Sequence, residues 1–265
     1  MTISSTQDNG KNRLKSLIFR LLAAVFWLLV WQLAAALVGK EILLPTPIAV
    51  IGRLFELGGT VKLWADTFSS LGRIMAGFGL GLLTGTVLGF LAYKLKFVRI
   101  LISPLLTVVK ATPVASFIIL ALVWLTRLHV PAFIAFLMVL PIVTENTVTA
   151  LGMTDRKLIE MENLFGFSFR RKCATLYFPS FSPYLFSSVK TSLGLSWKAG
   201  IAAEVLCTPV GSIGKNLYES KIYLETIDVF AWTVVVVIMS LILEKAITKL
   251  LELLFRKVGA LYDKH

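Results

Sequence analysis

The sequence predicts an all-α membrane protein with six transmembrane helices, and three observations support that prediction. Hydrophobic residues make up 57% of the 265 residues, whereas charged residues make up only 16%. A soluble domain needs about a quarter of its residues charged to cover its surface. Six apolar runs are each long enough to cross a bilayer, and basic residues gather at their ends.

The six runs divide the chain into one membrane domain and two short tails. Residues 1–16 are polar and form a predicted cytoplasmic N-terminal tail, and residues 251–265 form a charged cytoplasmic tail. The membrane domain is predicted at 17–250, with a polar loop at 152–183. The predicted spans cover residues 17–38, 71–93, 100–125, 130–151, 184–206 and 229–250.

The first run and the segment that follows it each allow two interpretations. The run at 17–38 could be a cleaved signal peptide, because three alanines stand near its end. Its length exceeds that of a usual signal core and favours a spanning helix. Residues 48–57 place apolar side chains at helical spacing, which predicts a short amphipathic helix. That helix would lie flat on the outer membrane face or pack as a surface helix on the extracellular side.

Basic residues in the loops set the predicted orientation. With the N-terminus inside, the inner segments hold far more lysine and arginine than the outer segments. The positive-inside rule therefore places both termini and the 152–183 loop in the cytoplasm. The net charge of +12 is then explained by orientation and lipid headgroups rather than by nucleic acid. Cys173 and Cys207 fall on opposite sides of the membrane in this topology, so we expect no disulfide between them. The sequence has no His/Cys cluster, and a metal site is therefore not predicted.

Four glycines recur at every fourth position of the second predicted span. Gly77, Gly81, Gly85 and Gly89 form one smooth strip on a helix. Lipid supplies no hydrophobic force between helices, so helix association depends on close backbone approach at small residues. The strip predicts a helix-packing surface, either inside one bundle or against a second subunit.

A proline breaks the third predicted span beside polar residues. Pro113 lacks the N–H that a helical carbonyl would accept, and such a break is tolerated where the freed groups meet protein or a wet cavity. Lys110, Thr112 and Ser116 stand next to it. This pattern predicts a wall of a translocation path. The alternative is a kinked helix whose lysine extends to the cytoplasmic surface.

Ionisable residues also stand inside the fourth and fifth predicted spans. They are Glu145, Lys198 and Glu204. Charged groups at membrane depth are costly and tend to face the bundle interior. Lys198 and Glu204 are six positions apart and do not share a helix face. We expect these side chains to line the path or to pair with other helices.

The 152–183 loop is the most specific feature of the sequence. Asp155 can cap a short helix that ends at Gly166, and a second short helix can follow before Pro179. Two short helices hinged at a glycine, with apolar side chains such as Phe165 exposed to cytoplasm, are unsuited to a plain connector. They predict an element that fits a groove of another protein.

The spacing in this loop resembles the cytoplasmic signature of ABC importer permeases. That signature reads Glu-Ala-Ala, three residues, Gly, nine residues, Ile, one residue, Leu-Pro. The matching positions are Glu160, Gly166, Leu176, Phe178 and Pro179. Met161 and Glu162 replace the two alanines, and Glu162 places a charge where the family has a small residue.

The resemblance extends over nearly the whole chain and is strongest to the nitrate/sulfonate/taurine branch of these permeases. The stretches that carry it are 44–47, 70–73, 77–78, the proline-bearing third span, 197–204 and 211–214. It implies a six-span subunit of the plasma membrane that forms a homodimer around a central path. It also implies two ABC ATPase subunits below and an extracytoplasmic substrate-binding protein above. The implied ATPase-coupling residues are Glu160, Glu162, Phe165, Gly166 and Pro179.

The chain itself is expected to be non-catalytic. It has no GxxxxGK[ST] loop, so ATP and Mg would be used by the partner ATPase, and no cofactor is expected on this chain. The implied cargo is a small solute, either an anion such as a sulfonate or nitrate or a vitamin-like heterocycle. The alternative function is an ion-gradient-driven secondary transporter, which inverted repeats would support, and none is visible.

Overall fold

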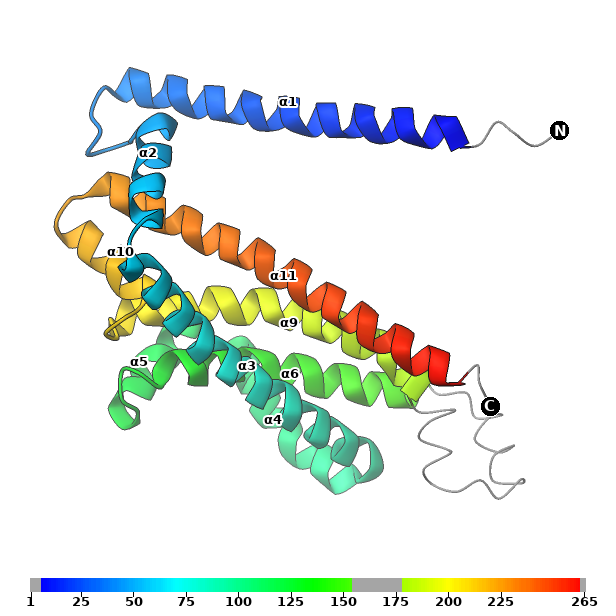
Figure 1. The fold of residues 1–265 in the computed structure, drawn as a ribbon. Helices are drawn as coiled ribbons and strands as arrows, with labels where there is room; N and C mark the ends of the chain where they lie inside the picture. The colour runs from blue at the N-terminus through cyan, green and yellow to red at the C-terminus, as the bar shows by residue number, and fades with distance from the viewer. Residues whose placement is uncertain (1–5, 154–177, 263–265) are drawn as a thin grey trace.

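The structure, a computed structural model, describes residues 6–153 and 178–262, and every regular element within them is a helix (Figure 1). The all-α prediction is therefore confirmed for this part of the chain. The helices are α1 (Thr6–Val38), α2 (Pro47–Gly58), α3 (Val61–Lys94), α4 (Lys96–Ala111), α5 (Val114–Trp124), α6 (Val130–Gly152), α9 (Phe178–Cys207), α10 (Ile213–Ile222) and α11 (Thr226–Tyr262).

Within the described residues, four helices are long and apolar enough to cross a membrane. They are α1, α3, α6 and α11, and the bent pair α4–α5 makes a fifth candidate. The remaining long helix, α9, does not reach the same apolarity. Its 30 residues would extend about 45 Å at 1.5 Å per residue, which is enough to cross a bilayer.

The third predicted span is two helices rather than one. The break expected at Pro113 is present, but α4 and α5 meet there at 109°, far beyond a kink. Thr112 ends α4 in an extended conformation (φ −83°, ψ 132°), because a residue before proline is pushed out of the helical region. The break predicted within the span at 100–125 is therefore present, and its angle makes this segment a sharply bent pair of helices.

The packing of α3 on α6 fixes the path of the chain between them. Gly77 lies against Ala132 and Gly89 lies against Thr147, so the two helices run parallel. Two long helices that follow one another can run parallel only if the intervening chain returns to the starting end. The bent pair α4–α5 makes that return, as Figure 1 shows.

The core lies where α3, α6, α9 and α11 meet. Ile74, Val139, Trp197 and Trp232 are buried there in one apolar cluster. Trp197 Nε1 donates to the Val236 carbonyl at 3.1 Å, which ties α9 to α11 across the core. The buried indole thus keeps a partner for its polar N–H.

The first two helices join the bundle at one end. Trp31 of α1 donates its Nε1 proton to the Pro45 carbonyl at 3.1 Å and stacks on Phe230 of α11. The amphipathic helix expected at 48–57 is present as α2, which Thr46 caps by accepting a hydrogen bond from the Ala49 N–H at 3.2 Å.

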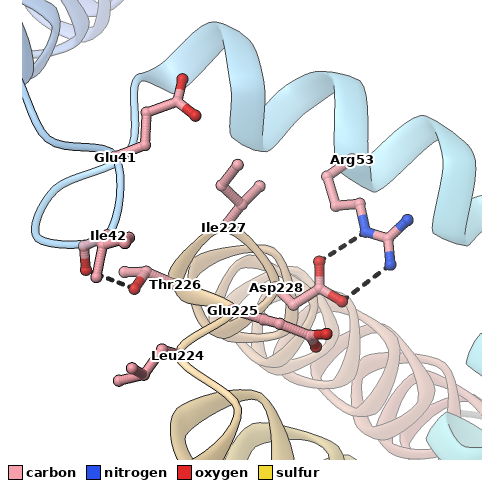
Figure 2. Close-up of a pocket in the computed structure, with 8 residues that line it drawn as sticks. All are labelled: Glu41, Ile42, Arg53, Leu224, Glu225, Thr226, Ile227 and Asp228. Carbon is pink, nitrogen blue, oxygen red and sulfur yellow. Dashed lines mark hydrogen bonds and ion pairs between the residues drawn. The ribbon is translucent and has the colours of Figure 1, made fainter.

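Arg53 ties α2 to the first turn of α11. Its Nε and Nη2 donate to the two carboxylate oxygens of Asp228 at 2.6 and 2.9 Å, as Figure 2 shows. A bidentate arginine–carboxylate pair fixes geometry as well as adding attraction. We call the end that holds α2, α10 and the start of α11 the α10 end. The opposite end holds the end of α6 and the start of α9.

Candidate translocation site

The glycine strip of α3 meets α6 of the same chain at close range. A methyl group built on Gly81 would lie 2.7 Å from Val139 Cβ, and one on Gly85 would lie 2.9 Å from Val143 Cβ. Real side chains do not approach so closely, so only glycine permits this helix spacing. The structure thus places the strip in the interior of one bundle, which was one of the two predicted uses of it.

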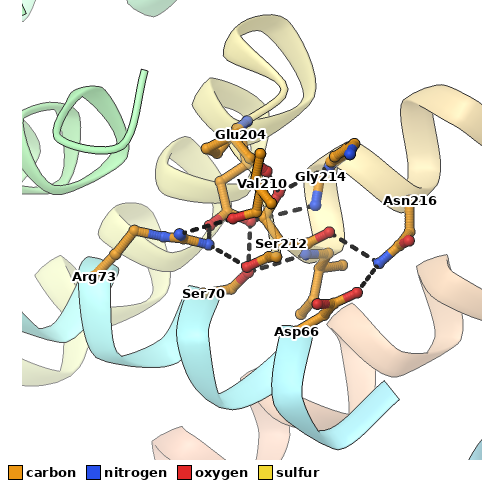
Figure 3. A network of polar contacts seen from close by, with 12 residues as sticks. Asp66, Ser70, Arg73, Glu204, Val210, Ser212, Gly214 and Asn216 are labelled. Carbon is orange, nitrogen blue, oxygen red and sulfur yellow. Dashed lines mark hydrogen bonds and ion pairs between the residues drawn. The ribbon is translucent and has the colours of Figure 1, made fainter. Parts of the chain in front are cut away.

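Glu204 is fully buried in α9 near the α10 end, with 0% of its side chain exposed. Ser70 of α3 donates to its Oε2 at 2.7 Å, and the Gly214 N–H donates to the same oxygen at 3.2 Å. Arg73 Nη2 donates to Oε1 at 3.1 Å and to the Gly211 carbonyl at 2.7 Å. A buried charge needs such partners to offset its lost hydration. Of the two roles predicted for Glu204, these contacts correspond to pairing between helices (Figure 3).

A second polar link continues the same network toward α10. Asn216 donates to Asp66 Oδ2 at 2.6 Å and to the Ser212 carbonyl at 3.0 Å. Ser70 also accepts a hydrogen bond from the Ile213 N–H at 3.0 Å. The network therefore joins α3, α9 and α10 into one unit at the α10 end (Figure 3).

Two of the predicted path residues meet at the junction of α4 and α6. Lys110 Nζ lies 2.6 Å from Glu145 Oε1, and the two side chains are 49% and 50% exposed. The pair sits just before the bend that Thr112 and Pro113 create. Thr112 is half-buried there, and Pro113 and Ser116 are exposed.

A hollow of about 350 Å³ lies beside the Lys110–Glu145 ion pair. It lies toward the end of the bundle where α6 ends and α9 begins. Glu145 is one of its lining residues and stands seven positions before the end of α6, or about 10 Å along the helix. The lining residues are Ala92, Arg99, Ile102, Ser103, Leu106, Thr144, Glu145, Val148 and Thr149. Polar groups therefore extend from the α4–α6 pair toward the end of the bundle.

Lys198 takes no part in either group of contacts. It is exposed on α9, between the buried side chains of Trp197 and Ala199. No ion pair or hydrogen bond joins its amine to another residue that the structure describes. The exposed face of α9 that carries it also holds Thr191, Leu195, Ala202 and Leu206.

Most of the predicted coupling residues lie outside the described residues. Glu160, Glu162, Phe165 and Gly166 belong to that group. Pro179 is the second residue of α9, where a helix loses no hydrogen bond to a proline. Because α9 begins at Phe178, residues 178–183 of the predicted loop segment belong to the first turns of this helix.

Sequence reasoning missed the partners of the charged groups. Arg73 and Glu204 both fall in stretches singled out in the sequence, yet they are 131 positions apart. The link between Asp66 and Asn216 spans 150 positions. Neither separation follows from a local spacing rule. The available signal was only that a carboxylate in an apolar helix requires a partner.

The fold and these contacts define a multi-pass membrane protein whose helices are joined by buried polar links. A family model described as "Binding-protein-dependent transport system inner membrane component" matches residues 77–258, which is more than half of the chain. The chain therefore belongs to this family, the permeases of ABC transporters, which are transport components rather than enzymes.

Curated relatives cover most of the chain at modest identity. A nitrate import permease of Synechocystis sp. is 28% identical over 203 residues, which is 73% of each chain. A putative aliphatic sulfonates transport permease of Bacillus subtilis is 25% identical and covers 78% of this chain and 75% of its own length. A riboflavin transport system permease of Chloroflexus aurantiacus is 26% identical, covering 74% and 75%.

Proposed function

We propose that this chain is the path-forming permease subunit of an ABC importer that carries a small solute inward. The observation that supports this most directly is the family match over 77–258, because it runs through the loop with the Glu160–Gly166–Pro179 spacing. Two copies of the chain would enclose the path, with two ATPase subunits at the opposite end. An extracytoplasmic binding protein would deliver the solute at the α10 end.

Six crossings with both termini in the cytoplasm are part of this proposal. Five candidates pass on length and apolarity when α4–α5 counts as one, and α9 would be the sixth. The ion pair of Lys190 with Glu244 and the contact of Trp197 with Val236 show that α9 runs antiparallel to α11. An antiparallel helix of this length, packed in the same bundle, would cross the same bilayer.

The proposed path runs along the bend and the exposed charges. The backbone break at Pro113 leaves helix-end groups unpaired, and at membrane depth such groups need protein or water. Lys110 and Glu145 are half-exposed beside it, and Lys198 stands on the exposed face of α9. A water-filled path between two copies would hydrate these groups.

The loop between α6 and α9 is proposed as the coupling element. Both helices pack closely on each other, so a displacement of the loop would move them together. ATP binding would draw the ATPases and the docked loops inward and turn the path outward, and hydrolysis would reset it. This chain supplies the lever and the path, while ATP and Mg are used by the ATPase partner.

The proposed cargo class follows from the relatives and the charges. Their names give nitrate, aliphatic sulfonates and riboflavin as what those proteins transport. Lys198, which is exposed and has no ion-pair partner among the described residues, would suit an anion, whereas the charge of Lys110 is balanced by Glu145. We therefore propose a small anion, such as a sulfonate or nitrate, or a vitamin-like heterocycle.

The coupling role of Gly166 is tested by Gly166→Pro, with Gly166→Ala as the matched control. Proline removes an N–H and locks φ, which should block the hinge in the loop. In proteoliposomes with the ATPase and binding protein, we expect Gly166→Pro to assemble but to lose uptake of labelled solute or to hydrolyse ATP without uptake. Gly166→Ala should keep most of the uptake. Normal ATP-driven uptake by Gly166→Pro would refute the coupling role, and wild-type uptake driven by an ion gradient alone would refute the importer.

A further inference from the structure

The helix α9 carries three charged side chains, and the fold neutralises two of them. Lys190 pairs with Glu244 of α11 at 3.3 Å, and the buried Glu204 pairs with Arg73 of α3 at 3.1 Å. Lys198 lies between them in the sequence, and its amine has no ion pair or hydrogen bond with another described residue. Within the described part of the chain, its charge is therefore the one on α9 that no neighbour balances.

Lys198 lies deep in the bundle rather than near one of its ends. It stands nine positions before Cys207, the last residue of α9, which is about 14 Å along the helix. The neighbouring Trp197 donates to the carbonyl of Val236, which stands ten positions, or about 15 Å, after the start of α11. The hydrocarbon core of a bilayer is about 30 Å thick. With the outer boundary at the α10 end, Lys198 lies near the middle of this core, where a charge facing lipid is costly.

The exposed face of α9 differs in composition from the exposed faces of α3 and α11. Around Lys198 the exposed residues of α9 are mostly small or polar, and they are Ser187, Thr191, Leu195, Ala202 and Leu206. The exposed residues at comparable positions of α3 and α11 are large and apolar, and they are Leu80, Leu83, Val87, Phe90, Val237, Ile238, Leu241 and Ile242. Lipid tails cover such apolar side chains readily, whereas an amine among small and polar residues needs water or a counter-charge. The face of α9 therefore suits a water-filled path better than lipid.

The residues on either side of Lys198 fix the direction in which it points. Trp197 is buried in the core between α9 and α11. Ala199 is buried in a second apolar cluster, together with Ile118 and Ala121 of α5. A rotation of α9 that buried the Lys198 amine would expose both neighbours to a different surface. The packing therefore holds Lys198 on the exposed face.

We propose that Lys198 is a specificity-determining residue, which selects the charge of the solute by placing its ammonium group in the path at mid-depth. This inference rests on the proposed function, because it requires that the exposed face of α9 lines a path between two copies. Two-fold symmetry gives that path two such ammonium groups, one from each copy. Lysine and arginine side chains in a pore attract anions and repel cations. A solute with a nitrate or sulfonate group exchanges part of its hydration for contact with Lys198, whereas a cation of the same size is repelled.

The test measures the charge preference of the path beside Lys198 with two thiol reagents. Ala202→Cys places a thiol one helical turn from Lys198 on the same exposed face, in a chain lacking Cys173 and Cys207. Membranes that hold the complex with its ATPase subunits are opened, so that reagents enter from both sides. The reagents are anionic sulfonatoethyl methanethiosulfonate and cationic trimethylammonioethyl methanethiosulfonate. We expect Lys198→Gln to lower the ratio of the anionic to the cationic labelling rate about tenfold, and Lys198→Arg to keep it.

Two controls match the position and the charge. Val237→Cys lies at the depth of Lys198 on the exposed apolar face of α11, and it should react with neither reagent. Lys215→Gln removes a lysine of α10 that pairs with Glu219 at 3.4 Å, and it should leave the ratio at position 202 unchanged. The role of Lys198 would be overturned by a ratio that Lys198→Gln leaves unchanged, or by equal labelling at positions 202 and 237. Failure of the Ala202→Cys thiol to react before denaturation would overturn it as well.

A second measurement needs no change at position 198. In the chain that keeps Lys198, the ratio should fall as salt rises, because ions in a water-filled path screen the charge. A ratio that salt leaves unchanged would contradict the inference.

Stimulation of ATPase activity by the binding protein separates this inference from the proposed function. Stimulated activity together with a ratio that is insensitive to Lys198→Gln would refute the role of Lys198 and keep the importer. A ratio that falls as expected in a complex that the binding protein does not stimulate would keep the charged path and refute the importer.

Discussion

At the residue scale, the molecule keeps a charge inside an apolar bundle by surrounding it with donors. Glu204 receives hydrogen bonds from Ser70, Arg73 and the Gly214 backbone. Gly214 has to be glycine for this contact, because a Cβ there would overlap Glu204 and its backbone. Removing one partner from such a network leaves the other charge buried and unpaired.

Replacing Glu204 by alanine should destabilise the folded bundle. Loss of the carboxylate leaves the Arg73 guanidinium with backbone carbonyls only, and it also leaves a cavity. We expect the variant to lose about 3–5 kcal/mol of stability, the usual cost of breaking a buried pair. The measurement is thermal unfolding of the purified chain in detergent, together with its amount in the membrane.

Glu56→Ala is the control for this change. Its carboxylate meets Arg53 on the surface with 69% of the side chain exposed. An exposed ion pair contributes about 0–1 kcal/mol to stability. The midpoint of thermal unfolding of Glu56→Ala should therefore stay close to that of the unsubstituted chain. Equal midpoints for Glu204→Ala and Glu56→Ala would show that the Glu204 network contributes nothing to the fold.

At the element scale, the glycine strip sets how α3 and α6 pack. Gly77 and Gly79 stand two positions apart on α3 but face different surroundings. Gly77 faces the backbone of Ala132, with Ala132 Cα 2.9 Å from a built Cβ, whereas Gly79 has open space. We expect Gly77→Ala to lose about 1–3 kcal/mol by overpacking. Gly79→Ala should be neutral or slightly stabilising, because glycine weakens a helix interior.

The Gly77→Ala and Gly79→Ala variants are compared by thermal unfolding and by their abundance in the membrane under identical expression. A backbone cannot rotate away as a side chain can, so α6 has to shift as a whole to admit the Gly77→Ala methyl group. A lower midpoint for Gly79→Ala than for Gly77→Ala would contradict the packing described for the strip.

Sequence alone predicts those elements whose length the bilayer imposes. The runs that became α1, α3, α6 and α11 were visible as apolar stretches of spanning length. The 109° bend of α4–α5 was not visible in the sequence. Pro113 indicates that the helix breaks, but tertiary packing sets the angle of the break. The helix α10 was also missed, since it is short and polar and has no apolar periodicity; Ser212 caps it by accepting from the Lys215 N–H.

The sequence indicated which charged residues belong to the candidate site, but it did not indicate which of them contact each other. Lys110 and Glu145 were both singled out for a charge at membrane depth, yet their contact depends on how α4 turns back along α6. The ion pair of Arg53 with Asp228 was not predicted, because charged residues near the ends of apolar runs are common and most are solvated. Three-dimensional proximity across 175 positions has no local signature.

At the scale of the whole molecule, the parallel packing of α3 and α6 constrains the topology. If α3 and α6 cross the membrane in the same direction, the chain between them has to cross once in the other direction. The bent pair α4–α5 must therefore pass from one side of the membrane to the other. The side chains that would then face opposite compartments are Lys96 at the start of α4 and Arg127 after α5. With the N-terminus inside, Lys96 and His265 should face the cytoplasm, whereas Lys40, Arg127 and Lys221 should face outward.

Single cysteines placed one at a time at these five positions in a chain lacking Cys173 and Cys207 test that arrangement. An impermeant maleimide added to intact cells should label Lys40→Cys, Arg127→Cys and Lys221→Cys. The other two variants should react only after the membrane is opened. Labelling of positions 96 and 127 from the same side would mean that the bent pair does not cross. The 152–183 loop would then face away from the ATPase, and the coupling proposal would fail with it.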